Sequence, residues 1–214
     1  MKGDKLIIGE EHIRAARELM DFFLPEITKH QGRFIMTVAG ESGSGKSEVA
    51  AALSDLLAEK DFQSVIIQQD DYFVYPPKTN ASLRRIDIHH VGLCEVHLTL
   101  LDQNLEDIMM GKEEIEKPLV LFDEDRIVEE TIALKGVKAV IVEGTYTTLL
   151  KNVDRHIFID RSYVDTKKSR KRRAREEQDE FLEKILKIEH QIISSHKPKA
   201  DIIITKDYEV KKNA

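Results

Sequence analysis

The amino-acid sequence predicts an α/β fold in which a parallel sheet of five strands is flanked by helices. The first observation is a set of short apolar runs, rich in β-branched residues: Phe34–Ala39, Ser64–Ile67, Ala139–Val142, His156–Ile159 and Ile202–Thr205. Strands that are buried on both faces have this composition, as in a parallel sheet covered by helices. The second observation is that amphipathic segments separate the runs, and such alternation is typical of βαβ units.

Helices are expected where apolar residues recur at a spacing of three and four. Three such segments follow the first strand: Ser47–Glu59, Glu95–Met110 and Val164–Ser195. A further amphipathic helix, Glu11–Lys29, precedes that strand, and its apolar side either packs against the main domain or contacts another copy of the chain. Pro76 and Pro77 predict a loop. We therefore divide the chain into an N-terminal helical extension, residues 1–32, and a main domain, residues 33–214.

The composition is that of a globular protein with a core. The 214 residues include 41% hydrophobic residues, one cysteine (Cys94), and 33 Lys and Arg against 39 Asp and Glu. The net charge of −6 argues against a nucleic-acid surface over the whole protein, and a lone cysteine excludes an intramolecular disulfide. No apolar run approaches the roughly 18 residues of a membrane span. We therefore expect a cytoplasmic protein that has no signal peptide and binds no membrane.

The segment after the first predicted strand carries the strongest functional signal. It matches G-x-x-x-x-G-K-[ST], the P-loop or Walker A motif, with Gly40, Glu41, Ser42, Gly43, Ser44, Gly45, Lys46 and Ser47. Glycines let consecutive backbone N–H groups turn toward phosphate oxygens, and the N-terminus of the following helix adds partial positive charge. Lys46 can reach the β- and γ-phosphates, and the Ser47 hydroxyl can bind Mg²⁺. The motif predicts a nucleotide site in a P-loop NTPase-type sheet.

Acidic residues follow the second and third predicted strands. The second strand runs into Gln68-Gln69-Asp70-Asp71, and the third ends at Glu143. Because the carboxyl ends of parallel strands line the ligand crevice, an Asp there can accept a proton from an incoming hydroxyl or bind Mg²⁺ through water. Asp70 is our first choice and Asp71 the alternative, and Glu143 is expected to hold the water shell of the metal. The alternative without a catalytic role is that these acids cap a helix or lie in a solvated turn.

A P-loop indicates nucleotide binding and leaves the reaction open. A kinase of small molecules, a GTPase switch and an ATPase coupled to motion are the three competing classes. A GTPase needs a D-x-x-G segment, and the sequence contains none. An ATPase of the third class usually has paired acids late in the sheet, whereas the third predicted strand ends in Glu143-Gly144. The pattern favours a kinase.

One dense cationic segment follows the fourth predicted strand. Seven of the nine residues in Lys167–Arg175 are Lys or Arg. Arg170 and Arg173 can share one side of a helix, and cations that close over a nucleotide stabilise the charge of phosphoryl transfer and exclude water. We therefore predict a helical lid over about residues 161–180. A solvated helix face and a nucleic-acid patch are the alternatives.

In order along the chain, these segments resemble the uridine kinase/phosphoribulokinase family of P-loop kinases. The matching pieces between residues 34 and 205 are GESGSGKS, QQDDYF, RRID, Asp125-Arg126, VIVEG, HIFID, the Arg170-x-x-Arg173 helix, FLEKIL, Glu189-His190 and KPKADIII. The resemblance implies a sheet of strand order 2-3-1-4-5, ATP and Mg²⁺ as ligands, and a small-molecule hydroxyl as the acceptor. It also leaves a homo-oligomer open, because uridine kinases often form tetramers.

The resemblance further implies roles for single residues. Asp70 corresponds to the catalytic base, and Arg170 and Arg173 correspond to lid arginines near the phosphates. The positions that correspond to the substrate side are Tyr72, Asp87, Arg126 and His190. Two positions depart from uridine kinases: Glu124 replaces a His that recognises the pyrimidine, and Leu119 replaces an aromatic residue.

Together these observations predict an ATP-dependent kinase whose catalytic residues are Asp70, Lys46, Arg170 and Arg173. Its metal would be held by Ser47, Asp70 and Glu143. A nucleoside such as uridine is the leading acceptor, and a sugar, a sugar phosphate or another polyol is the alternative. A nucleotide-dependent regulatory or nucleic-acid-binding protein is the non-enzymatic alternative.

Overall fold

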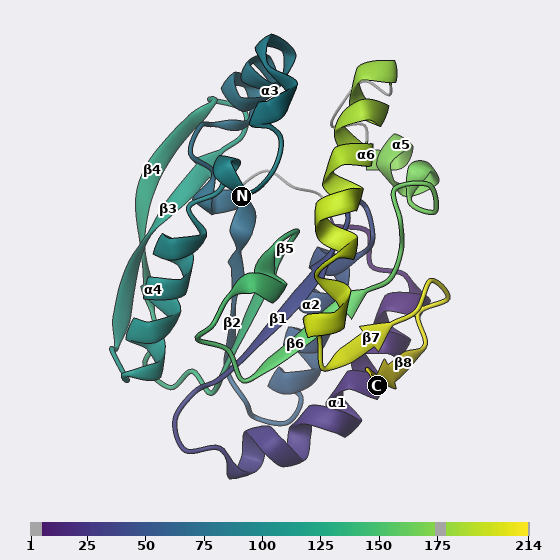
Figure 1. Cartoon of the computed structure of the whole chain (residues 1–214). Helices are drawn as coiled ribbons and strands as arrows, with labels where there is room; N and C mark the ends of the chain where they lie inside the picture. The colour runs from purple at the N-terminus through teal and green to yellow at the C-terminus, as the bar shows by residue number, and fades with distance from the viewer. Residues whose placement is uncertain (1–5, 174–178, 214) are drawn as a thin grey trace.

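The central sheet confirms the predicted α/β fold. The computed structural model describes residues 6–173 and 179–213, without the side chains of residues 172 and 173. Six strands form the sheet in the order β2-β5-β1-β6-β7-β8 (Figure 1). Their bounds are β1 Phe34–Gly40, β2 Ser64–Gln68, β5 Ala139–Gly144, β6 Arg155–Ile159, β7 Ile202–Ile204 and β8 Val210–Lys212. Five of them, β2, β5, β1, β6 and β7, are parallel. When these five strands are numbered along the chain, their order is the expected 2-3-1-4-5.

The predicted strand count is wrong by one, because β8 extends the edge of the sheet. β8 pairs with β7 in antiparallel orientation, with Val210 opposite Ile204. Its sequence, Val-Lys-Lys, is short and mostly polar. It therefore lacks the apolar run that identifies a strand buried on both faces in a sequence. Charged residues are common on edge strands, so this composition fits the position of β8 at the edge of the sheet.

One face of the sheet is covered by α1 (Glu10–Lys29) and α2 (Lys46–Ala58). Both helices share one hydrophobic core with β1, β5, β6 and β7. From α1, the side chains of Leu19, Phe23 and Ile27 enter this core, and each residue is at most 1% exposed. The apolar side of the helix before the first strand therefore packs against the main domain. Among the described residues, no helix is long and apolar enough to cross a membrane.

The opposite face is covered by α4 (Leu98–Met109), by the end of α6 (Glu180–Ser194) and by a hairpin of β3 (Glu114–Leu121) and β4 (Arg126–Ala133). Figure 1 shows this hairpin beside α4. The sequence predicts no strand there, because β3 is only half buried and contains Pro118, which weakens a strand signal. Short 3-10 helices complete the fold: η1 Gln69–Tyr72, η2 Ile88–His90, η3 Leu93–Glu95, η4 Thr147–Leu149 and η5 Lys197–Lys199.

Two further predictions are wrong about where helices begin and end. The loop expected at Pro76 and Pro77 is the start of α3 (Pro77–Ile86), because Pro77 occupies the first helical turn, where a missing N–H costs nothing. The single helix expected over Val164–Ser195 contains α5 (Lys167–Arg173) and a separate α6. A new helix begins after Asp179, whose carboxylate accepts a hydrogen bond of 2.7 Å from the Leu182 N–H. In Figure 1, α3 and α6 rise on opposite sides above the carboxyl ends of the parallel strands.

Candidate active site

The P-loop connects β1 to α2 and adopts a backbone that needs its glycines. Gly43 and Gly45 have φ values of 73° and 99°, in the left-handed region that favours glycine. A Cβ atom on Gly43 would lie 2.9 Å from the Cγ of Arg170, so a neighbour also approaches too closely for another side chain. The Lys46 ammonium donates to the Glu41 carbonyl at 3.0 Å, which keeps it over the loop. The loop therefore has the compact form that a phosphate-binding turn requires.

Oxygen ligands gather where β1, β2 and β5 end. The Ser47 hydroxyl and the Gln68 side-chain amide each donate to the same Glu143 carboxylate oxygen at 3.0 Å. Burial raises the pKa of Glu143 and the neighbouring Asp70 carboxylate raises it further, whereas Lys46 opposes this shift. Hydroxyl and carboxylate oxygens are the ligands that Mg²⁺ prefers, and a cation between the two acids would relieve their repulsion. The donor set therefore fits Mg²⁺.

The geometry separates the two neighbouring aspartates that the sequence left as alternatives. Asp70 lines the cavity in front of the P-loop. Asp71 is buried, and its carboxylate accepts from the Lys117 ammonium at 2.7 Å and from the Val120 N–H at 3.1 Å. Because both contacts come from β3, Asp71 anchors the hairpin to η1, while Asp70 faces the site.

A single cavity of about 250 Å³ joins the P-loop to a second compartment. Its P-loop side is lined by Ser42, Gly43, Lys46, Ser47, Asp70, Glu143 and Thr145. Its other side is lined by Phe73, by residues of α3 and α6, and by the hairpin turn: Pro77, Lys78, Asn80, Ala81, Arg84, Phe122, Leu182, Ile185, Leu186 and Glu189. The phosphate-binding loop, Asp70 and Glu143 thus face a compartment with aromatic and aliphatic walls.

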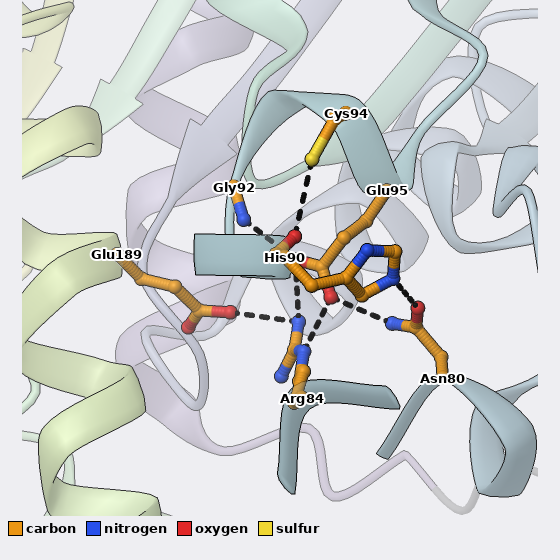
Figure 2. A network of polar contacts seen from close by, with 7 residues as sticks. All are labelled: Asn80, Arg84, His90, Gly92, Cys94, Glu95 and Glu189. Carbon is orange, nitrogen blue, oxygen red and sulfur yellow. Dashed lines mark hydrogen bonds and ion pairs between the residues drawn. The ribbon is translucent and has the colours of Figure 1, made fainter. Parts of the chain in front are cut away.

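Arg84 joins the two helices that enclose this second compartment. Figure 2 shows the Arg84 guanidinium of α3 between Glu95 and Glu189, the latter from α6. One guanidinium nitrogen lies 3.0 Å from a Glu95 carboxylate oxygen and 3.1 Å from a Glu189 oxygen. Glu95 is only 1% exposed and also accepts from Asn80 at 2.8 Å and from the Gly92 N–H at 2.7 Å. The positive charge of Arg84 is therefore matched within the wall of the cavity.

The expected lid arginine Arg170 lies against the P-loop. It is 6% exposed, its side chain packs on Gly43, and its guanidinium donates to the carbonyl of Tyr163 at 2.6 Å. The side chain of the second expected arginine, Arg173, lies outside the described residues. The exposed Lys167 pairs with Glu183 at 2.7 Å. Of the described cations, Arg170 thus lies beside the P-loop, and Lys167 lies beside α6.

His190, which the resemblance places on the substrate side, contacts the P-loop instead. Its Nδ1 lies 2.6 Å from a Glu41 carboxylate oxygen. The other Glu41 oxygen accepts from the Tyr163 N–H at the start of the lid. The carboxylate of Glu41 therefore connects the P-loop, the start of the lid and α6. It is a site feature that the motif alone does not suggest, because the second position of a P-loop motif is unrestricted.

The other three residues expected on the substrate side also lie outside the cavity lining. Tyr72 is fully buried, and its hydroxyl donates to Asn104 at 2.9 Å, so its ring fills the core beneath η1. Asp87 is exposed and accepts from the His89 N–H at 2.9 Å. Arg126 is exposed on the hairpin and pairs with Glu124 at 2.7 Å. A short motif shows where a residue lies along the sequence, whereas packing decides whether its side chain faces the cavity, the core or the solvent.

The residues that line the second compartment were mostly not predicted from the sequence. Phe122 supplies an aromatic wall from the turn of a hairpin that the sequence did not reveal. Asn80 and Arg84 belong to the unpredicted α3, and Glu189 lies one residue from His190. Phe73 lies in the QQDDYF segment and Arg84 in the RRID segment, both of which carry the family resemblance, but neither residue was given a role from the sequence.

The sheet order, the P-loop and the acids at the strand ends define a P-loop nucleotide-binding protein of kinase type. The model of the Phosphoribulokinase / Uridine kinase family matches residues 35–205, and the chain belongs to this family.

Individual relatives agree with this assignment. A uridine kinase from Staphylococcus epidermidis is 28% identical over 182 residues, which cover 79% of this chain and 86% of that protein. A bifunctional alpha-galactosidase/sucrose kinase from Mediterraneibacter gnavus is 24% identical over 191 residues, and the match spans 83% of this chain and only 20% of that longer protein. Among solved structures, a possible uridine kinase from Bacillus stearothermophilus superposes with a TM-score of 0.62 and 18% identity, covering 87% of this chain and 97% of that one. The last similarity shows the shared fold.

Proposed function

We propose that this protein transfers the γ-phosphoryl group of ATP to a hydroxyl of a small molecule, with a nucleoside such as uridine as the leading acceptor. The observation that carries the proposal is the single cavity in which the P-loop, Asp70 and Glu143 face a compartment enclosed by α3 and α6. Membership of the phosphoribulokinase/uridine kinase family supports a kinase activity. A donor and an acceptor bound in one cavity would meet at Asp70.

Each residue has a role that follows from its position. The P-loop amides and Lys46 bind the phosphates, and Asp70 orients the acceptor hydroxyl and takes its proton. Mg²⁺ held by Ser47, Asp70 and Glu143 would neutralise charge on the phosphates. Arg170, which lies against Gly43, stabilises charge on the transferring group, and Arg173 is expected to assist from the same helix.

The walls of the second compartment favour an acceptor with a planar apolar part. Phe73 and Phe122 provide aromatic faces, and Leu186 provides an aliphatic one. A phosphate on the acceptor would need positive charge on this side of the cavity, but Arg84 is already paired with Glu95 and Glu189, and the Lys78 ammonium already donates to the Asp123 carbonyl at 2.9 Å. We therefore rank a nucleoside above a sugar phosphate, and a free sugar or polyol between them.

The proposal is tested by ADP release in the presence of ATP, Mg²⁺ and a panel of nucleosides, sugars, sugar phosphates and polyols. We expect uridine or another nucleoside to stimulate release, and Asp70→Asn to abolish turnover while ATP still binds. Asp55→Asn is the matched control, because Asp55 is an exposed acid of α2 outside the cavity lining, and the activity of this variant should equal that of the wild type. Full activity of Asp70→Asn would refute the assigned base. Salt-dependent RNA binding without any stimulated ADP release would support the non-enzymatic alternative.

A further inference from the structure

The P-loop backbone is held from behind by a tyrosine near the end of the chain. The Tyr208 hydroxyl donates to the carbonyl of Ser44 at 2.8 Å. A Cβ atom on Gly45 would lie 2.5 Å from this hydroxyl and 2.9 Å from the Nε2 atom of His12 in α1. Tyr208 is 5% exposed. A residue of the N-terminal helix and one of the C-terminal segment therefore meet directly behind the loop.

The direction of the hydrogen bonds to the Tyr208 hydroxyl follows from its neighbours. The Gly9 N–H donates to the Nδ1 atom of His12 at 2.9 Å, so the ring hydrogen of this imidazole lies on Nε2. Nε2 then donates to the Tyr208 oxygen at 3.1 Å, and the Arg161 guanidinium donates to the same oxygen. Both acceptor positions of the hydroxyl are thereby occupied, and its own hydrogen points to Ser44. Burial raises the pKa of the Tyr208 hydroxyl, which keeps that hydrogen in place.

This arrangement fixes the orientation of one peptide group in the P-loop. In a planar trans peptide the carbonyl and the N–H point in opposite directions. Because Tyr208 holds the Ser44 carbonyl at the back of the loop, the N–H of Gly45 points away from Tyr208. Rotation of this peptide would turn a carbonyl, which repels anions, toward bound phosphate.

We propose that Tyr208 and His12 are positioning residues of the nucleotide site, which orient the Ser44–Gly45 peptide so that its N–H binds a phosphate of the nucleotide. The N-terminal helix, which the sequence leaves without a function, thus contributes to the P-loop itself. This inference rests on the proposed function only in requiring that the P-loop binds a nucleotide.

The test compares three variants by calorimetric binding of a non-hydrolysable ATP analogue with Mg²⁺. Tyr208→Phe removes the hydroxyl and keeps the buried ring, and we expect the Kd for the analogue to rise about tenfold, the scale of one lost hydrogen bond with its partners left unpaired. His12→Leu should weaken binding in the same direction and serves if Tyr208→Phe does not fold. His12→Gln places a donor near the position of Nε2 and should bind more tightly than His12→Leu.

Arg14→Ala is the matched control. Arg14 is on the same helix and donates to the Asp207 carbonyl at 2.9 Å, one residue before Tyr208, but it has no role at the P-loop. We expect this variant to bind the analogue like the wild type, and we expect the Kd for uridine to be unchanged in all the variants. Wild-type analogue binding by Tyr208→Phe, or equal weakening by Arg14→Ala, would overturn the inference. Failure of the wild-type protein to bind the analogue would refute the proposed function, and the inference with it.

Discussion

The contrast between Asp70 and Asp71 can be turned into a measurement of stability. Asp71 and Lys117 form an ion pair of 2.7 Å in which the side chains are 4% and 3% exposed. Replacing Asp71 by Asn leaves the Lys117 ammonium in the core without its main counter-charge. Asp70→Asn, by contrast, changes a residue that faces the cavity. Asp71→Asn should therefore lower stability, whereas Asp70→Asn should lower turnover.

The magnitude follows from the surroundings of the pair. Removing one partner of a buried ion pair typically costs about 3–5 kcal/mol. We expect the lower end, about 3 kcal/mol, because Asn still accepts a hydrogen bond and Glu130 lies 3.1 Å from the same ammonium. For a chain of this length, 1 kcal/mol shifts Tm by about 2–4 °C, so the expected decrease is about 6–12 °C.

The assay is thermal and urea unfolding followed by circular dichroism, beside the ADP-release assay. The double variant Asp71→Asn/Lys117→Met removes both charges and should be more stable than Asp71→Asn alone, because no unpaired charge remains in the core. A Tm for Asp71→Asn equal to that of the wild type, together with lost turnover, would refute the assignment. Asp71 would then be the catalytic base.

Three further predictions concern other parts of the protein. Burial lowers the pKa of His156 below its usual value near 6.5, so the unfolded chain binds more protons than the folded protein just below pH 6.5. The free energy of unfolding therefore decreases as the pH drops. In measurements from pH 7 to 5, the Tm of His156→Asn should decrease less than that of the wild type. Glu41→Ala removes the acceptor of the Tyr163 N–H, and amide exchange at Tyr163 should accelerate about tenfold; unchanged exchange would show that Glu41 does not restrain the lid. On the proposed function, Phe122→Ala should raise the KM for the acceptor that stimulates ADP release about three- to tenfold and leave the KM for ATP unchanged, since one aromatic contact contributes about 0.5–1.5 kcal/mol. An equal rise in both constants would place Phe122 outside the acceptor compartment.

The sequence by itself determined the parallel sheet and the P-loop, and the strand order followed only from the resemblance to a family of P-loop kinases. Uninterrupted apolar runs are produced by burial on both faces, and the phosphate-binding loop needs glycines at fixed spacing for its left-handed turns. Both are local requirements. The one-sided strands of the hairpin and the edge strand β8 leave weaker patterns, and they were not predicted.

Only the tertiary structure decided which acid faces the cavity and what encloses the acceptor side. Asp70 and Asp71 are adjacent and chemically identical, and they differ because β3, from a distant part of the chain, places Lys117 against one of them. The contact of His12 with Tyr208 spans 196 positions of sequence. Such contacts depend on how helices and strands pack together, and no local pattern of residues records that packing.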